Sequence, residues 1–73
     1  MGRKMELKED LAVIINAEWR RRGINKKELA MLLGITGQKV MQITHGYLDL
    51  LTVEELEECI DTLEETHDGK PMQ

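Results

Sequence analysis

The spacing of hydrophobic positions along the chain predicts helices and no strands. Between residues 7 and 22, Leu7, Leu11 and Ile14 recur at intervals of three and four residues, with charged residues between them. This is the period of an amphipathic helix. Gly23 follows and favours a helix end, because glycine adopts the left-handed conformation of a C-terminal cap without strain. No segment shows the apolar–polar alternation of a half-buried strand, so we expect an all-α fold.

Two short helices are expected close together in the middle of the chain, at 26–33 and 37–45. Asn25 has the side chain of an N-cap for the first of them, and Thr36 has that of an N-cap for the second. Gly34 favours the end of the first helix, which leaves a turn of about three residues between the two. Two helices joined by so short a turn indicate a helix-turn-helix unit.

The last predicted helix spans 53–65. Thr52 and Glu55 have the spacing of a capping box, in which each side chain accepts a hydrogen bond from the other residue's backbone amide. Leu56 and Ile60 lie on one face of this helix, and most of its other positions are acidic. The pattern therefore predicts a fourth helix with one buried face and a strongly negative outer face.

A chain of 73 residues forms one small domain, because it buries only about 60% of the surface that it exposes when unfolded. We expect a flexible basic arm at 1–6, a helical domain at 7–65 and a disordered tail at 66–73.

The net charge of −4 is unevenly distributed along the chain. Residues 1–46 contain nine Lys or Arg and five Asp or Glu, a balance of +4, whereas residues 47–73 contain one Lys and nine acids, a balance of −8. Interactions between exposed charges are largely screened beyond about 8 Å at physiological salt, so a positive face can exist on an acidic protein. The overall charge does not exclude a nucleic-acid partner.

Enzymatic and metal-binding functions find little support in the sequence. His45, His67 and Cys59 have no metal-ligand spacing, and no base lies one helical turn from Cys59 to activate its thiol. We expect no catalytic activity, metal or cofactor. One cysteine cannot form an intramolecular disulfide, and no stretch approaches the roughly 18 apolar residues of a membrane span. We therefore expect no membrane association and a reducing cytoplasmic location.

The segment GINKKELAMLLGITGQKVMQITHG, from Gly23 to Gly46, resembles the Cro/repressor type of helix-turn-helix, often called XRE-like. Phage regulators and antitoxins of toxin–antitoxin pairs have such domains, and the resemblance extends over about Leu7 to Leu63. It implies a small four-helix, lambda-repressor-like domain whose third helix, about 37–45, lies in the major groove of duplex DNA. The implied function is that of a sequence-specific transcriptional regulator, which binds a two-fold related site as a homodimer.

The resemblance also implies which residues contact DNA. Side chains at the start of the second helix touch phosphates, and side chains at the start of the third reach base edges, where a glutamine can pair with adenine. Residues just after the third helix meet the DNA backbone. The implied contacts are Asn25, Lys26, Lys27, Thr36, Gln38, Lys39, Gln42, His45 and Tyr47. For each of these residues the alternative is that its side chain lies on a solvated helix face and contacts no DNA.

Four positions differ from the family pattern, two of them as a pair. Gly37 stands where a base-reading glutamine is common, and Met41 places an apolar side chain on the outer face of the third helix. Trp19 and Thr44 together replace a buried arginine–glutamate pair, and we expect Trp19 to pack in the core in its place.

These differences leave a second function open. In this second function the helix-turn-helix domain is a protein-binding module, such as a phage-encoded inhibitor or an antitoxin. It binds its partner through Met41 and the acidic last helix. For a homodimer, the preferred contact surface is the loop Tyr47–Leu51, with Leu48 and Leu50 expected to be exposed.

Overall fold

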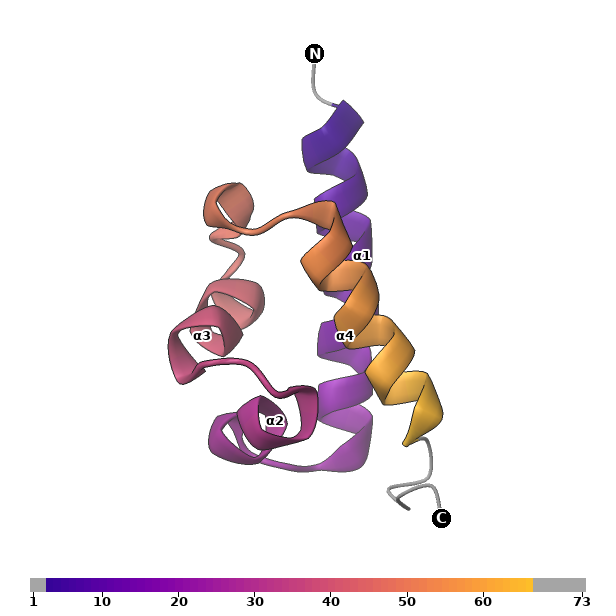
Figure 1. The fold of residues 1–73 in the computed structure, drawn as a ribbon, viewed down its shortest axis with the longest axis vertical. Coiled ribbons are helices and arrows are strands. Elements are labelled where there is room, and N and C mark those ends of the chain that lie inside the picture. Colours follow the sequence, from indigo (N-terminus) through magenta and orange to yellow (C-terminus); the bar gives the residue numbers. More distant parts are fainter. Residues whose placement is uncertain (1–2, 67–73) are drawn as a thin grey trace.

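The computed structural model describes residues 3–66 and contains, within them, α-helices, a short 3-10 helix and no strand (Figure 1). The elements are α1 (Arg3–Arg22), α2 (Lys26–Leu33), α3 (Gly37–His45), η1 (Leu48–Leu50) and α4 (Val53–Glu65). The expected all-α class with four helices is confirmed.

The bounds of α2, α3 and α4 are those predicted, because local capping determines where each helix begins. The Glu28 amide donates to Asn25 Oδ1 over 2.7 Å, and the Asn25 amide donates to Glu28 Oε1 over 2.9 Å, which completes a capping box. Thr52 and Glu55 exchange the equivalent pair of hydrogen bonds, each 3.0 Å long, at the start of α4.

The first helix begins earlier than the pattern predicted. It starts at Arg3, so residues 3–6, which were expected to belong to a flexible arm, are helical. The segment from Arg3 to Leu7 contains neither glycine nor proline and consists of residues with good helix propensity, so nothing in it stops the helix. The predicted tail at 66–73 lies outside the described residues except for Thr66, whose amide caps α4.

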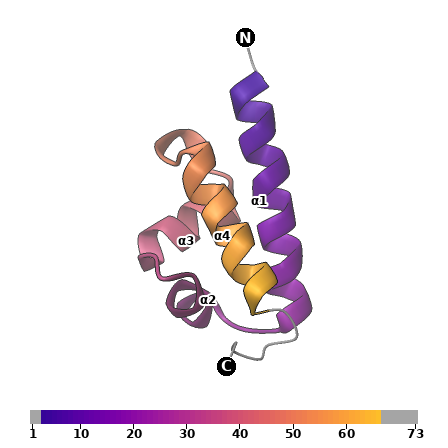
Figure 2. The same ribbon diagram turned by 45° about the vertical axis from the view of Figure 1, so that its right-hand side comes forward.

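The core is aliphatic and is formed by all four helices. α1 and α4 lie side by side, and α2 and α3 cover the same side of this pair (Figure 2). The most deeply buried large side chains are Ile15, Leu29, Val40, Leu56 and Leu63. Trp19 packs against this core as expected, and its indole Nε1 is buried without a hydrogen-bond partner within the described part of the chain.

Arg22 joins the end of α1 to the end of α4. Its Nη2 donates to the backbone oxygen of Leu63 over 2.7 Å, its Nη1 donates to Thr66 Oγ1 over 3.3 Å, and its Nε lies 3.0 Å from a carboxylate oxygen of Glu18. A cation in this place complements the free carbonyl groups at the C-terminus of α4. Arg22 therefore has a structural role.

No helix within residues 3–66 is both long enough and apolar enough to cross a lipid bilayer.

Candidate nucleic-acid interface

The turn between α2 and α3 is built from three residues. Gly34 adopts the left-handed conformation, with φ of 69°, and the amide of Ile35 donates back to the Ala30 oxygen over 3.1 Å. A residue with a Cβ atom is strained in that conformation, so glycine suits this position. Thr36 then caps α3 through its Oγ1, which accepts from the Lys39 amide over 3.2 Å. The turn thus starts α3 immediately after α2 ends.

One face of α3 is buried and the opposite face is exposed. Val40 and Ile43 point into the core. The Asn16 side chain of α1 donates to the backbone oxygen of Ile43 over 3.2 Å, which fixes α3 on α1. The exposed face of α3 consists of Gly37, Gln38, Met41 and His45. Their spacing of one, three and four residues places all four on the outer side of the helix.

The start of α2 meets the end of this exposed face. Lys26 Nζ lies 3.2 Å from His45 Nε2, and the His45 ring stacks on the Tyr47 ring with centroids 6.0 Å apart. An ammonium group can only donate, so the His45 Nε2 atom is the acceptor in this contact. The amide of Tyr47 donates to the Gln42 oxygen over 2.8 Å, which holds the turn after α3. Lys26, His45 and Tyr47 therefore form one polar edge beside α3.

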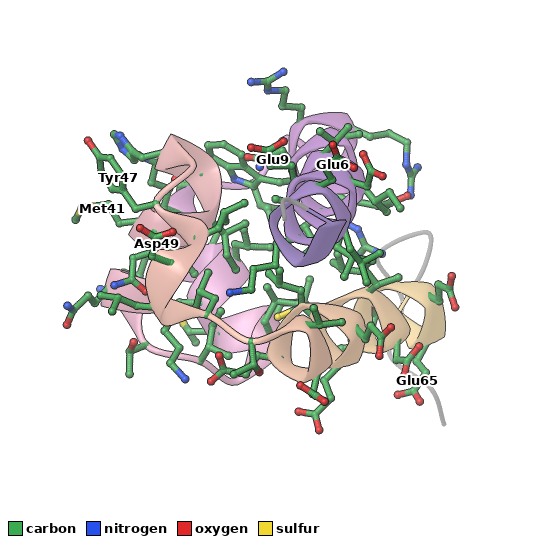
Figure 3. The ribbon with its side chains drawn as sticks, turned by 90° about the horizontal axis from the view of Figure 1, so that it is seen from above. Glu6, Glu9, Met41, Tyr47, Asp49 and Glu65 are labelled. Atoms are coloured by element: carbon green, nitrogen blue, oxygen red, sulfur yellow. The ribbon has the colours of Figure 1, made fainter. Side chains whose placement is uncertain are left out.

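A shallow apolar hollow lies between α2 and α3 on the outside of the molecule. Met31 and Met41 line it and remain 74% and 51% exposed. Gly37 also lines the hollow, and nothing lies within 4 Å of the position that a Cβ atom would take there. Lys26 and Lys27 lie at the edge of the hollow. Figure 3 shows Met41 and Tyr47 on the same side of the molecule.

Lys39 lies apart from this surface. Its ammonium group forms an ion pair with Glu55 in the first turn of α4. The hydrogen bond from Lys39 lowers the pKa of the Glu55 carboxyl, and the Thr52 amide lowers that pKa further. Lys39 is one of the DNA contacts that the resemblance implies, but one helical step of about 100° carries it from Gln38 toward the side that α4 covers.

The other expected contact residues differ in how far their side chains are already engaged. Asn25 and Thr36 are exposed, and their side-chain oxygens cap α2 and α3. Gln42 is half-buried, whereas Gln38 and Lys27 are exposed. The structure thus brings Lys26, His45 and Tyr47 together, places Gln38 on the adjoining face, and separates Lys39 from them.

The loop after α3 differs from the expectation at one position. Leu50 is 75% exposed as expected, but Leu48 is 4% exposed, so its predicted exposure is wrong. The 3-10 helix η1 turns Leu48 toward α1, and Lys8 Nζ donates to the Leu48 backbone oxygen over 3.4 Å. A tight turn of three residues has no periodicity long enough to reveal which side is buried.

Met31 is a surface residue that is not among the contacts implied by the resemblance. It follows Ala30 on α2 and lies on the side opposite the buried Leu29. A helical projection of α2 would have shown this, because Met31 falls about 200° from Leu29 around the helix axis.

Within residues 3–66, the titratable groups outside this surface form no second candidate functional site. Cys59 lies on the buried face of α4, and desolvation raises the pKa of its thiol. Among the described residues, no cluster of three or more His, Cys, Asp or Glu side chains has the arrangement of a metal site.

Comparisons of the chain with protein-family models, with curated proteins and with solved structures found no match. A helix-turn-helix scaffold does not by itself determine function, since the same fold supports unrelated activities. The function is inferred from the surface described above.

Proposed function

We propose that this protein is a sequence-specific regulator of transcription that binds duplex DNA with α3 in the major groove. The observation that supports this most is the contact between Lys26 and His45. It joins the first turn of α2 to the far end of the exposed face of α3. A duplex that receives α3 in its groove then has a phosphate strand beside Lys26.

Five residues of this surface have roles in the proposal. Gln38 lies near the start of α3 and reads a base edge, since a glutamine amide can donate to and accept from adenine at once. Lys26 and Lys27 contact phosphates and add affinity for every sequence. His45, the last residue of α3, and Tyr47, just after it, contact the DNA backbone. Lys39 is left out of the contact set because it is paired with Glu55.

The distribution of charge agrees with this orientation. The outer side of α4 carries the exposed acids Glu54, Glu57 and Glu58. Figure 3 shows Glu65 of α4 on the far side of the molecule from Met41 and Tyr47. A duplex that approaches the α2–α3 surface is therefore distant from the C-terminal end of the acidic α4, whereas Asp49 of η1 lies on the same side as Met41 and Tyr47 (Figure 3).

One α3 helix covers about one half-site, which gives limited specificity by itself. The proposed regulator therefore acts as a homodimer on a two-fold related site. Its proposed location is the cytoplasm.

A salt titration with duplex DNA of random sequence tests the proposal. Each phosphate contact should contribute about −0.9 to the slope of log K against log salt concentration, so Lys26 and Lys27 predict a slope of about −2 or steeper per chain. The Lys26→Ala, Lys27→Ala double variant should lose this contribution. Absence of binding at low salt, or binding that ignores salt, would overturn the proposal.

A second function is favoured by a different observation. Met31 and Met41 line the hollow between α2 and α3 and are largely exposed. Methionine adapts well to varied partner surfaces. In this alternative the scaffold binds a protein through Met41, with the acidic α4 directed at a basic partner. Loss of protein binding in Met41→Ala, together with no effect of Gln38→Ala or Lys26→Ala on any duplex, would favour it.

A further inference from the structure

The outer face of α1 is not covered by any other described element. Figure 2 shows α1 at one edge of the molecule, with α2, α3 and α4 all on one side of it. Ala12 and Ile15 point to that side and are buried. The opposite side includes two large apolar side chains in the middle of the helix, Val13 and Ile14, which are 65% and 46% exposed.

The two ends of this face carry opposite charges. Glu6 and Asp10 are exposed toward the N-terminal end, and Arg20 is exposed toward the C-terminal end, where the neighbouring Arg21 is ion-paired with Glu18. Figure 3, which looks along α1, shows Glu6 on the side of the helix away from α4. The face is therefore acidic at one end, apolar in the middle and basic at the other end.

We propose that this face of α1 binds the same face of a second copy of the chain, with the two helices antiparallel. Reversal of one helix brings its acidic end to the basic end of the other. The two-fold axis crosses the helix midway between Val13 and Ile14. Glu6 and Arg20 then lie on opposite sides of the axis, each about 10 Å from it along the helix, so Glu6 of one copy faces Arg20 of the other. The face is thus complementary to itself, as a two-fold interface requires.

The centre of the interface follows from the same geometry. Val13 of one copy packs against Val13 of the other on one side of the helix–helix seam, and Ile14 packs against Ile14 on the other side. Ala17 is exposed and lies between these two rows. Its small side chain allows the helices to approach closely where it faces Asp10 of the second copy.

The order of charges selects a second copy over an unrelated partner. A purely acidic or purely basic rim would fit a partner of the opposite sign. Here Glu6 and Arg20 flank the same apolar centre. An antiparallel second copy places an opposite charge next to each of them at the same time. The dimer is expected to form without DNA, so a failure to dimerise can be distinguished from a failure to bind DNA. Only the placement of this dimer on a two-fold DNA site rests on the proposed function.

Sedimentation equilibrium of the full chain, without DNA, measures the association directly. An interface formed by one helix from each copy is small, so a chain concentration of about 100 μM is appropriate. The unmodified chain should show the mass of a dimer, and Val13→Glu should show the mass of a monomer. The helical circular dichroism signal should stay unchanged, because Val13 is exposed. A monomeric mass for the unmodified chain would overturn the proposal.

Leu50→Glu is the matched control, since Leu50 is also a highly exposed apolar residue but lies on η1. It should leave the dimer intact. If Leu50→Glu dissociates the dimer and Val13→Glu does not, the contact lies in the loop after α3 and the α1 proposal is wrong.

A charge exchange tests the antiparallel arrangement. Glu6→Arg alone and Arg20→Glu alone should each dissociate, because each homodimer then contains two like-charged pairs. An equimolar mixture of the two variants should regain the mass of a dimer, since both pairs in the mixed dimer are attractive again. A mixture that stays monomeric, while the unmodified chain is dimeric, would rule out the antiparallel pairing.

Discussion

Lys39 and Glu55 form an ion pair that joins the first turn of α3 to the first turn of α4. Glu55 has two roles there, because one carboxylate oxygen accepts from the Lys39 ammonium group and the other accepts from the Thr52 amide over 3.0 Å. The pair fixes the start of the proposed recognition helix on the acidic helix. It also withdraws one cation from the surface proposed to meet DNA.

Glu55→Gln should reduce stability slightly at neutral pH. The glutamine oxygen can still accept from the Thr52 amide, so the loss is that of the ion pair, about 0.2–1 kcal/mol for side chains as exposed as these. Because folding lowers the pKa of Glu55, its stabilising contribution is present above the unfolded-state pKa and disappears as the pH falls through the folded-state pKa. Urea unfolding at several pH values measures this.

The difference in unfolding free energy between the unmodified chain and Glu55→Gln should therefore shrink in acid. Glu54→Gln, at the neighbouring exposed position, is the matched control and should show a smaller difference at neutral pH. If the difference in unfolding free energy between the unmodified chain and Glu55→Gln persists at a pH below the range in which carboxyl groups titrate, the ion pair is not the cause of that difference.

Gln38→Ala and Lys26→Ala should have different effects on DNA binding. A base contact from Gln38 contributes about 1–3 kcal/mol to discrimination between sequences, whereas a phosphate contact from Lys26 strengthens binding to all sequences. Gln38→Ala should remove sequence preference and keep non-specific binding, and Lys26→Ala should weaken both. Affinities for a selected duplex and for a scrambled duplex measure the two effects. Equal losses on both duplexes for Gln38→Ala would exclude base reading at this position.

Lys39→Met should leave the salt dependence of DNA binding unchanged. Lys39 is paired with Glu55 and is expected to displace no counterion from DNA. Lys26→Ala, in the same titration, should make the slope of log K against log salt shallower by about 0.9. A similar change in slope for Lys39→Met would mean that Lys39 leaves Glu55 and binds a phosphate in the complex.

Met41 should favour thymine at one position of each half-site. Its exposed side chain borders the apolar hollow, and the thymine methyl group is the apolar group in the major groove. Replacing the thymines of a selected duplex one at a time by deoxyuridine removes only the methyl group, so binding should weaken at one position in each half-site. The same replacement should have no effect on Met41→Ala. If no thymine position responds in the unmodified protein, Met41 does not contact a base.

Neutralising the outer side of α4 should leave DNA binding intact or strengthen it. The triple variant Glu54→Gln, Glu57→Gln, Glu58→Gln removes three negative charges from a helix placed away from the duplex, and so reduces long-range repulsion of phosphates. Affinity for the selected duplex at low salt measures the change. Loss of binding with an unchanged circular dichroism spectrum would show that α4 takes part in the complex.

The helices, their order and the short turn could be predicted because their signals are local. Asn25 with Glu28, and Thr52 with Glu55, satisfy backbone amides within three residues, and the left-handed Gly34 and Gly46 end α2 and α3. The start of α1 was predicted too late, because the apolar repeat begins at Leu7 although the residues before it also favour a helix.

Only the tertiary structure decided which side chains of the surface act together. The contacts of Lys26 with His45, Lys39 with Glu55, and Arg22 with Leu63 join residues 19, 16 and 41 positions apart. The burial of Leu48 likewise depends on how η1 packs on α1. Hydrophobic periodicity and capping report on neighbours along one helix, whereas these contacts depend on how the helices cross, which is set by packing of the whole core.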